Sequence, residues 1–132
     1  MTSNGRKPAG GNSYRGGYLR SVPWFRRRDA WFAEQEARTG QLRCILCWQT
    51  ATRRELQLHH LEYARVTLHG SRWVSGEEHE DLCAMHPGCH ELLHRILDAD
   101  PVLRWHRTRP IATLHAIRIA RTRLMTADRA SR

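Results

Sequence analysis

The chain has 132 residues and a formal net charge of +9, with 40% hydrophobic and 27% charged residues. This length indicates one domain with tails. No apolar run reaches the length of a membrane span, and the N-terminus lacks the apolar core of a signal peptide. We therefore expect a cytoplasmic protein without a membrane partner, in which the four cysteines stay reduced.

Positive charge is concentrated at the two ends of the chain. Residues 1–39 hold eight basic and three acidic residues, residues 40–103 hold six and nine, and residues 104–132 hold eight and one. All but one of the basic residues are arginine, which binds phosphate in a two-pronged geometry. This distribution favours a nucleic-acid partner. The candidate contacts are Arg26, Arg27, Arg28, Arg53, Arg54, Arg118 and Arg121.

The first 20 residues contain five glycines, four basic residues and no acids. Such a composition predicts a disordered basic leader over residues 1–20. A single domain is expected over residues 21–126, followed by a frayed basic tail at 127–132.

A helix is predicted after the leader. Ser21 is suited to cap it, Pro23 is tolerated in its first turn, and Gly40 is a plausible stop. An aromatic stripe recurs at helical spacing and is expected in the core. Its members are Trp24, Phe25, Trp31 and Phe32.

Cys44 and Cys47 follow this helix directly. Two cysteines separated by two residues can reach one metal ion from a tight turn, which is a zinc knuckle. A redox dithiol is the alternative, but that motif requires a βαβ unit, and the sequence lacks its pattern.

Two short strands are predicted next. Residues 56–61 alternate apolar and polar and end in His59-His60, and residues 82–85 form a short apolar run. Adjacent side chains of a strand point to opposite faces, so the two histidines share one site only if the strand ends or twists there. Residues 62–79 show no period and are predicted to be a loop.

A helix is predicted from Cys89 to Leu97. His90 and His94 lie four residues apart and therefore on one face of it, where two imidazoles can bind one metal ion. The letters also match the His-Glu-x-x-His helix of zinc proteases. That alternative needs a third ligand further along, such as His106 or His115, and the basic flanks argue against it.

A break is expected at Asp100-Pro101, followed by a last helix over about residues 111–125. Its apolar side is predicted from the helical spacing of five residues. They are Ile111, Leu114, Ile117, Leu124 and Met125.

In order and spacing, these motifs together resemble the HNH endonucleases, the ββα-metal nucleases that carry a zinc knuckle. The resemblance covers about residues 40–97. It implies an α+β fold, in which a small ββα-metal core is stapled by the knuckle and flanked by N- and C-terminal helices.

The resemblance implies a structural Zn²⁺ site made of Cys44, Cys47, His86 and Cys89. The family usually has cysteine where this chain has His86, and imidazole is a sound zinc ligand. Cys83 is the alternative fourth ligand. We favour His86 because its spacing to Cys89 repeats that of the first pair, which leaves Cys83 as a buried thiol.

The resemblance also implies a catalytic site. His59, His90 and His94 would hold one divalent ion and His60 would be the general base. Asp81 stands where the namesake asparagine stands, and it would either ligate the ion or hold the loop and tune His60. Three imidazoles favour Mn²⁺, Ni²⁺, Co²⁺ or Zn²⁺, while Mg²⁺ suits the site if Asp81 and water complete the shell.

The implied function is a metal-dependent DNA endonuclease that hydrolyses phosphodiester bonds of double-stranded DNA and leaves 5′-phosphate and 3′-hydroxyl ends. A homodimer, or a phage packaging or restriction partner, would fit such an enzyme. The alternative is a non-catalytic, zinc-stabilised nucleic-acid-binding module.

Overall fold

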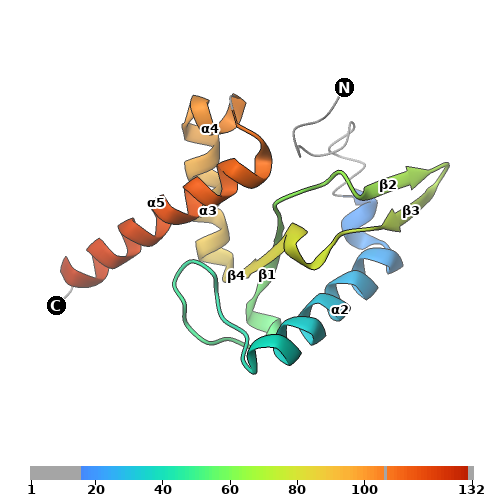
Figure 1. Cartoon of the computed structure of the whole chain (residues 1–132), viewed down its shortest axis with the longest axis horizontal. Coiled ribbons are helices and arrows are strands. Elements are labelled where there is room, and N and C mark those ends of the chain that lie inside the picture. Colours follow the sequence, from blue (N-terminus) through green and yellow to red (C-terminus); the bar gives the residue numbers. More distant parts are fainter. Residues whose placement is uncertain (1–15, 106, 131–132) are drawn as a thin grey trace.

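A computed structural model describes residues 16–105 and 107–130 of the chain. The fold is α+β: a strand pair lies at the centre, with one long helix and a hairpin on one side and three helices on the other (Figure 1). The elements, in order, are η1 (Tyr18–Arg20), α2 (Val22–Thr39), η2 (Arg53–Glu55), β1 (Gln57–His60), β2 (Val66–His69), β3 (Arg72–Ser75), η3 (His79–Asp81), β4 (Leu82–Met85), α3 (Pro87–Ala99), α4 (Pro101–Trp105) and α5 (Arg109–Ala130).

Helix α2 begins and ends where its capping residues predict. The hydroxyl of Ser21 accepts a hydrogen bond from the backbone N–H of Trp24 at 3.3 Å. Gly40 ends the helix with φ of 77°, a left-handed conformation that favours glycine. The aromatic stripe is buried except for Phe25, which is 50% exposed and corrects that part of the prediction.

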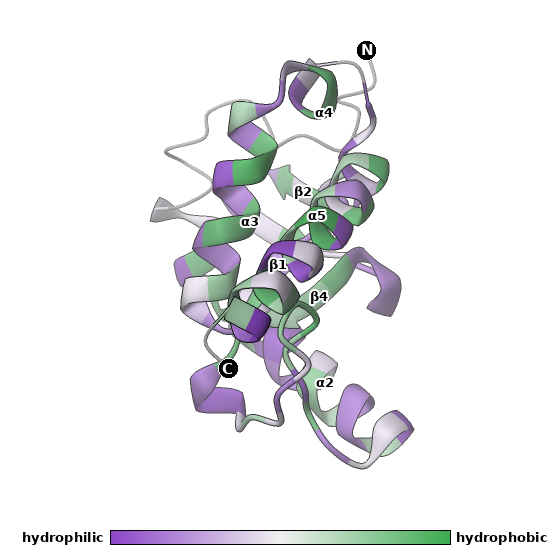
Figure 2. Cartoon of the chain, turned by 90° about the vertical axis from the view of Figure 1, so that its left-hand side faces the viewer, coloured by the Kyte–Doolittle hydropathy of each residue, from purple (hydrophilic) through white to green (hydrophobic). Residues whose placement is uncertain are grey.

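The two predicted strands form an antiparallel pair, β1 with β4, in which His59 is opposite Cys83 and His60 is opposite Leu82. Helix α3 follows β4 directly and begins at Pro87, two residues before its predicted start, since proline is favoured in a first turn. The order β1, β4, α3 is a ββα arrangement. In Figure 2 α3 carries hydrophobic and hydrophilic residues side by side, as a helix with one buried face does.

Residues 62–79 are not a plain loop, which corrects the prediction. They contain the hairpin β2–β3, joined at Gly70, whose φ is 64°. Most of its side chains are exposed on both faces, with Val66 buried. Apolar and polar residues alternate in a strand only when one of its faces is buried, and this hairpin buries almost nothing, so its sequence lacks the pattern.

Helix α5 buries a different face from the predicted one. Ile111, Leu114 and Met125 are largely exposed, and of the five predicted core residues only Ile117 is buried. The buried face consists mainly of small residues, which let α5 approach the neighbouring helices closely. Its members are Ala112, Thr113, Ala116, Ile117 and Ala120.

The structure describes parts of both predicted tails. Tyr18–Arg20 form a 3₁₀ turn, and the Tyr18 side chain is fully buried. Residues 1–15 of the expected leader lie outside the described part. At the other end, α5 continues to Ala130, through most of the predicted tail. None of the described helices is long and apolar enough to cross a membrane.

Candidate metal centres

The four predicted knuckle residues form one group. Cys44, Cys47, His86 and Cys89 offer ligand atoms that all lie within 4.8 Å of one another. Cys47 Sγ lies 3.4 Å from His86 Nδ1, and the backbone N–H of His86 points to Cys44 Sγ at 3.4 Å. Three sulfurs and one imidazole are consistent with a structural Zn²⁺ site.

The electrostatics of this group also suit a cation. Burial opposes ionisation of Cys44, but backbone N–H groups of Cys47, His86 and Leu46 outweigh burial and lower its pKa to about 7. Burial and the neighbouring thiolates raise the pKa of Cys89. A divalent cation would remove the repulsion between the thiolates that causes part of this rise.

Cys83 lies outside the group, which agrees with the assignment of His86 as the fourth ligand. It is buried in β4, and burial raises the pKa of its thiol to about 12. It therefore stays protonated and behaves as a small apolar side chain.

The knuckle is fixed to both sides of the domain. The backbone N–H of Ile45 donates to the Ala84 carbonyl of β4 at 2.9 Å, and Arg121 Nε of α5 donates to the Ile45 carbonyl at 2.8 Å. His86 is also the N-cap of α3. A metal ion there would join a strand to two helices.

A second group contains the three histidines predicted to hold a divalent ion. His59 Nδ1 lies 3.2 Å from His90 Nε2, which lies 3.0 Å from His94 Nε2. His59 is buried, whereas His90 and His94 are partly exposed, so the group opens to solvent beside α3. Burial and then the positive charge of Arg109 hold the pKa of His59 well below its usual range, which leaves a lone pair for a metal ion.

The ring nitrogen of His90 that faces away from the group fixes which of its nitrogens carries the proton. His90 Nδ1 lies 2.8 Å from the amide oxygen of Gln57, which can only accept a hydrogen bond, so Nε2 keeps its lone pair and directs it into the group, as a metal site requires. His59 Nε2 lies 3.3 Å from the hydroxyl of Thr113 and 3.4 Å from the NH2 group of Arg109, which can only donate, so these contacts do not assign the His59 proton to Nε2.

Two residues of α5 that support the group were missed in the sequence because they lie outside the recognised motif. Thr113 is fully buried behind His59. Arg109 donates through Nε to the His60 carbonyl at 2.7 Å, and its NH2 group lies 3.2 Å from the Tyr63 hydroxyl. In the sequence Arg109 is one of several arginines of a basic arm, and no pattern singles out Thr113.

Removing the Thr113 hydroxyl is expected to weaken the three-histidine site. Thr113→Val keeps the side-chain shape but removes the hydroxyl 3.3 Å from His59 Nε2, so Co²⁺ or Mn²⁺ should dissociate about tenfold more readily, the usual scale for such supporting contacts. Competition titration with a chelating dye measures this. Thr113→Ser should restore the affinity, and equal affinities in wild type and Thr113→Val would show that the contact is unimportant.

His60 lies on the opposite face of β1 from His59 and is not part of the metal group. It is 3% exposed, its Nε2 lies 2.8 Å from Glu77 Oε2, and its ring stacks on Tyr63 at a centroid distance of 4.7 Å. Burial lowers the pKa of His60, and the hydrogen bond to Glu77 offsets part of this effect. The ring is therefore neutral near pH 7, with its proton on Nε2.

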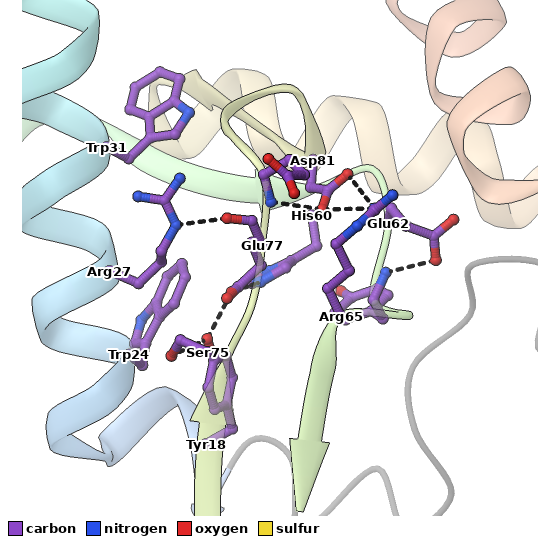
Figure 3. A network of polar contacts seen from close by, with 12 residues as sticks. Tyr18, Trp24, Arg27, Trp31, His60, Glu62, Arg65, Ser75, Glu77 and Asp81 are labelled. Atoms are coloured by element: carbon purple, nitrogen blue, oxygen red, sulfur yellow. Dashed lines mark hydrogen bonds and ion pairs between the residues drawn. The ribbon is translucent and has the colours of Figure 1, made fainter.

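Glu77 is a buried carboxylate that the sequence did not single out. Figure 3 shows it between Tyr18, His60 and Arg27, and the Tyr18 hydroxyl donates to its Oε2 at 2.6 Å. Burial raises the pKa of Glu77, but the hydrogen bonds from His60 and Tyr18 outweigh it, and the net direction is downward. Its other oxygen, Oε1, has no hydrogen-bond partner among the described residues.

Asp81, the predicted partner of His60, lies apart from the three-histidine group. Both of its carboxylate oxygens accept from Arg65 at 2.9 Å, and Oδ2 also accepts from the backbone N–H of Glu78 (Figure 3). Its carbonyl accepts from Leu61 N–H at 2.7 Å. Asp81 therefore joins η3 to Arg65 and to the residue after β1.

The predicted nucleic-acid contacts divide into two sets. Arg27 is largely buried and donates to the Glu77 carbonyl, which argues against its assignment as a nucleic-acid contact. Arg28 donates to the Arg53 carbonyl, and Arg53 pairs with Glu36 at 2.8 Å. Arg53 is exposed, as are the other four: Arg26, Arg54, Arg118 and Arg121, of which Arg121 also donates to the Ile45 carbonyl.

The zinc-protease alternative is not supported by the described residues. The third imidazole beside His90 and His94 is His59 of β1. His115 is exposed on α5 and is not part of the group. His106 lies outside the described residues.

Comparisons of the chain with protein-family models, with curated proteins and with solved structures found no match. The ββα order and the Cys₃His group are consistent with the HNH resemblance and do not by themselves establish it.

Proposed function

We propose that the protein is a metal-dependent endonuclease that hydrolyses phosphodiester bonds of DNA. The observation that carries this proposal is that His59 of β1 and His90 and His94 of α3 form one group within a ββα unit. Exposed arginines on α2 and α5 and a net charge of +9 would hold a polyanionic substrate.

The donor set fits a divalent transition metal, because three imidazoles each offer a ring nitrogen to one point. Such an ion supplies charge neutralisation for the phosphate and stabilises the departing oxygen. Three protein ligands leave coordination positions for substrate, and the two partly exposed histidines leave a route for it.

His60 is the proposed proton acceptor for the attacking water. It is neutral near pH 7, and with its Nε2 proton directed at Glu77 the lone pair lies on Nδ1. Because β1 sends His59 and His60 to opposite faces, a phosphate that reaches both would bind across the end of the strand, beside Leu61. Asp81 would contribute by holding that end in place.

One observation favours the non-catalytic alternative. His60 is 3% exposed and enclosed by aromatic rings, so it would reach water only after the surrounding residues move. A zinc-stabilised nucleic-acid-binding module would need no such movement.

A nicking assay distinguishes the two functions. Supercoiled plasmid is incubated with the protein and each of Mn²⁺, Co²⁺, Ni²⁺, Zn²⁺ and Mg²⁺. At least one ion is expected to support nicking, and His60→Ala should lower the rate by about 10²- to 10⁴-fold, the usual contribution of a general base. A native-like circular dichroism spectrum of His60→Ala at the assay temperature checks folding, because loss of this buried ring is expected to lower the thermal midpoint. Plasmid that stays intact with every ion would contradict the nuclease proposal.

A further inference from the structure

Trp48 occupies an unusual backbone position. It follows the second cysteine of the knuckle, and among the described residues it is the sole non-glycine residue with positive φ, at 65°. A bulky side chain is rarely found there. The side chain is 59% exposed, so burial does not account for a tryptophan at a position suited to glycine. Such an outlier points to a role for the exposed ring.

Two arginines flank the exposed ring. The guanidinium carbons of Arg43 and Arg121 lie 5.7 and 5.9 Å from the centre of the Trp48 ring. Each arginine is also anchored to the knuckle backbone: Arg43 donates to the Trp48 carbonyl at 2.9 Å and Arg121 to the Ile45 carbonyl at 2.8 Å. The positive charges are therefore held over the ring, and its 59% exposure leaves part of the ring open to solvent.

The surface beside Trp48 is hollowed on two sides. Hollows of ≈ 530 and ≈ 650 Å³ adjoin there, and Trp48 and Arg121 line both of them. The first hollow contains one acid, Glu80, which lies 3.4 Å from Arg38, and the second contains Asp128. A flat ligand with attached anionic groups would find space, an aromatic face and fixed cations together.

We propose that Trp48 is a stacking platform for an unpaired base of a nucleic acid, with Arg43 and Arg121 contacting the adjoining phosphates. Stacking on an aromatic ring accepts any base, and arginines along the backbone supply the attraction to phosphate. In a duplex both faces of a base are stacked on the neighbouring bases. Trp48 would therefore strengthen the binding of single-stranded or unpaired DNA more than that of a duplex. This inference holds whether or not the protein cleaves DNA.

Fluorescence anisotropy with labelled single-stranded and fully paired DNA of equal length, without added divalent ion, tests the proposal. Trp48→Ala should weaken binding of the single strand by about tenfold, the scale of losing one stacked base. Binding of the paired duplex should change less than twofold by the same reasoning, and Trp48→Phe should retain most of the affinity for the single strand.

Trp105 provides a matched control, because it is 52% exposed and Arg104 lies 4.9 Å from its ring centre. Trp105→Ala should bind both DNAs like wild type. Equal losses of single-strand affinity in Trp48→Ala and Trp105→Ala would overturn the proposal, as would an unchanged affinity in Trp48→Ala. The surface around Trp48 would then be a candidate site for a protein partner. Trp48→Gly, which relieves the backbone, should melt at or above the wild-type temperature, whereas a large drop would make Trp48 a packing residue.

Discussion

Cys89→Ser is expected to remove the structural zinc and unfold the domain. Cys89 lies in the first turn of α3, next to His90, so its sulfur joins the knuckle to the helix that carries two of the three clustered histidines. Loss of a metal ligand belongs to the small class of changes that cost more than about 4 kcal/mol. Metal analysis should show one equivalent fewer of Zn²⁺, and circular dichroism should show a lower or absent unfolding transition.

Cys83→Ala is the matched control for that experiment. Cys83 is also a cysteine and is more buried than Cys89, but it lies outside the Cys₃His group. It should keep the full zinc content and lose only the packing of one sulfur atom, roughly 1–2 kcal/mol. If Cys83→Ala lost zinc while Cys89→Ser kept it, the ligand assignment would be wrong.

His94→Ala is expected to abolish nicking while the domain stays folded. The side chain belongs to the three-histidine group and is partly exposed, so its removal leaves no large cavity. With two imidazoles left, the affinity for a divalent ion should fall, and the nicking rate should fall by at least about 10³-fold, since metal activation supplies several kcal/mol. The readouts are nicking rate, metal stoichiometry and thermal midpoint.

His115→Ala controls for the loss of an imidazole as such. His115 is exposed on α5 and lies in neither metal group. It should nick plasmid at the wild-type rate and bind the same number of ions. A His94→Ala protein that binds as many ions as wild type would refute the site, whatever its activity, so metal binding and cleavage are tested separately.

Local spacing predicted the paired ligands of both groups, and the HNH resemblance added His59. The spacing of Cys44 and Cys47 defines a tight turn, and the four-residue spacing of His90 and His94 puts both rings on one helix face. The limits of α2 were also predictable, because Ser21 and Gly40 act on the backbone within one turn of their own position.

Contacts between distant segments could not be predicted in this way. Glu77 reaches His60 only because the hairpin folds back onto η1, and the exposed strands of that hairpin carry no hydrophobic pattern. The buried face of α5 was predicted wrongly, because the larger apolar residues lie outside and the close approach of α3 selects alanine and threonine inside.

The sequence, together with the HNH resemblance, therefore predicted which residues cluster as candidate metal ligands and which elements carry them, since ligand type and local spacing depend on neighbouring residues. The tertiary structure decided how those ligands are supported. Gln57 sets the protonated nitrogen of His90, Thr113 and Arg109 contact His59 Nε2, and the pleat of β1 separates His60 from the group. Ring orientation depends on hydrogen bonds between segments up to 54 residues apart, which no local pattern records.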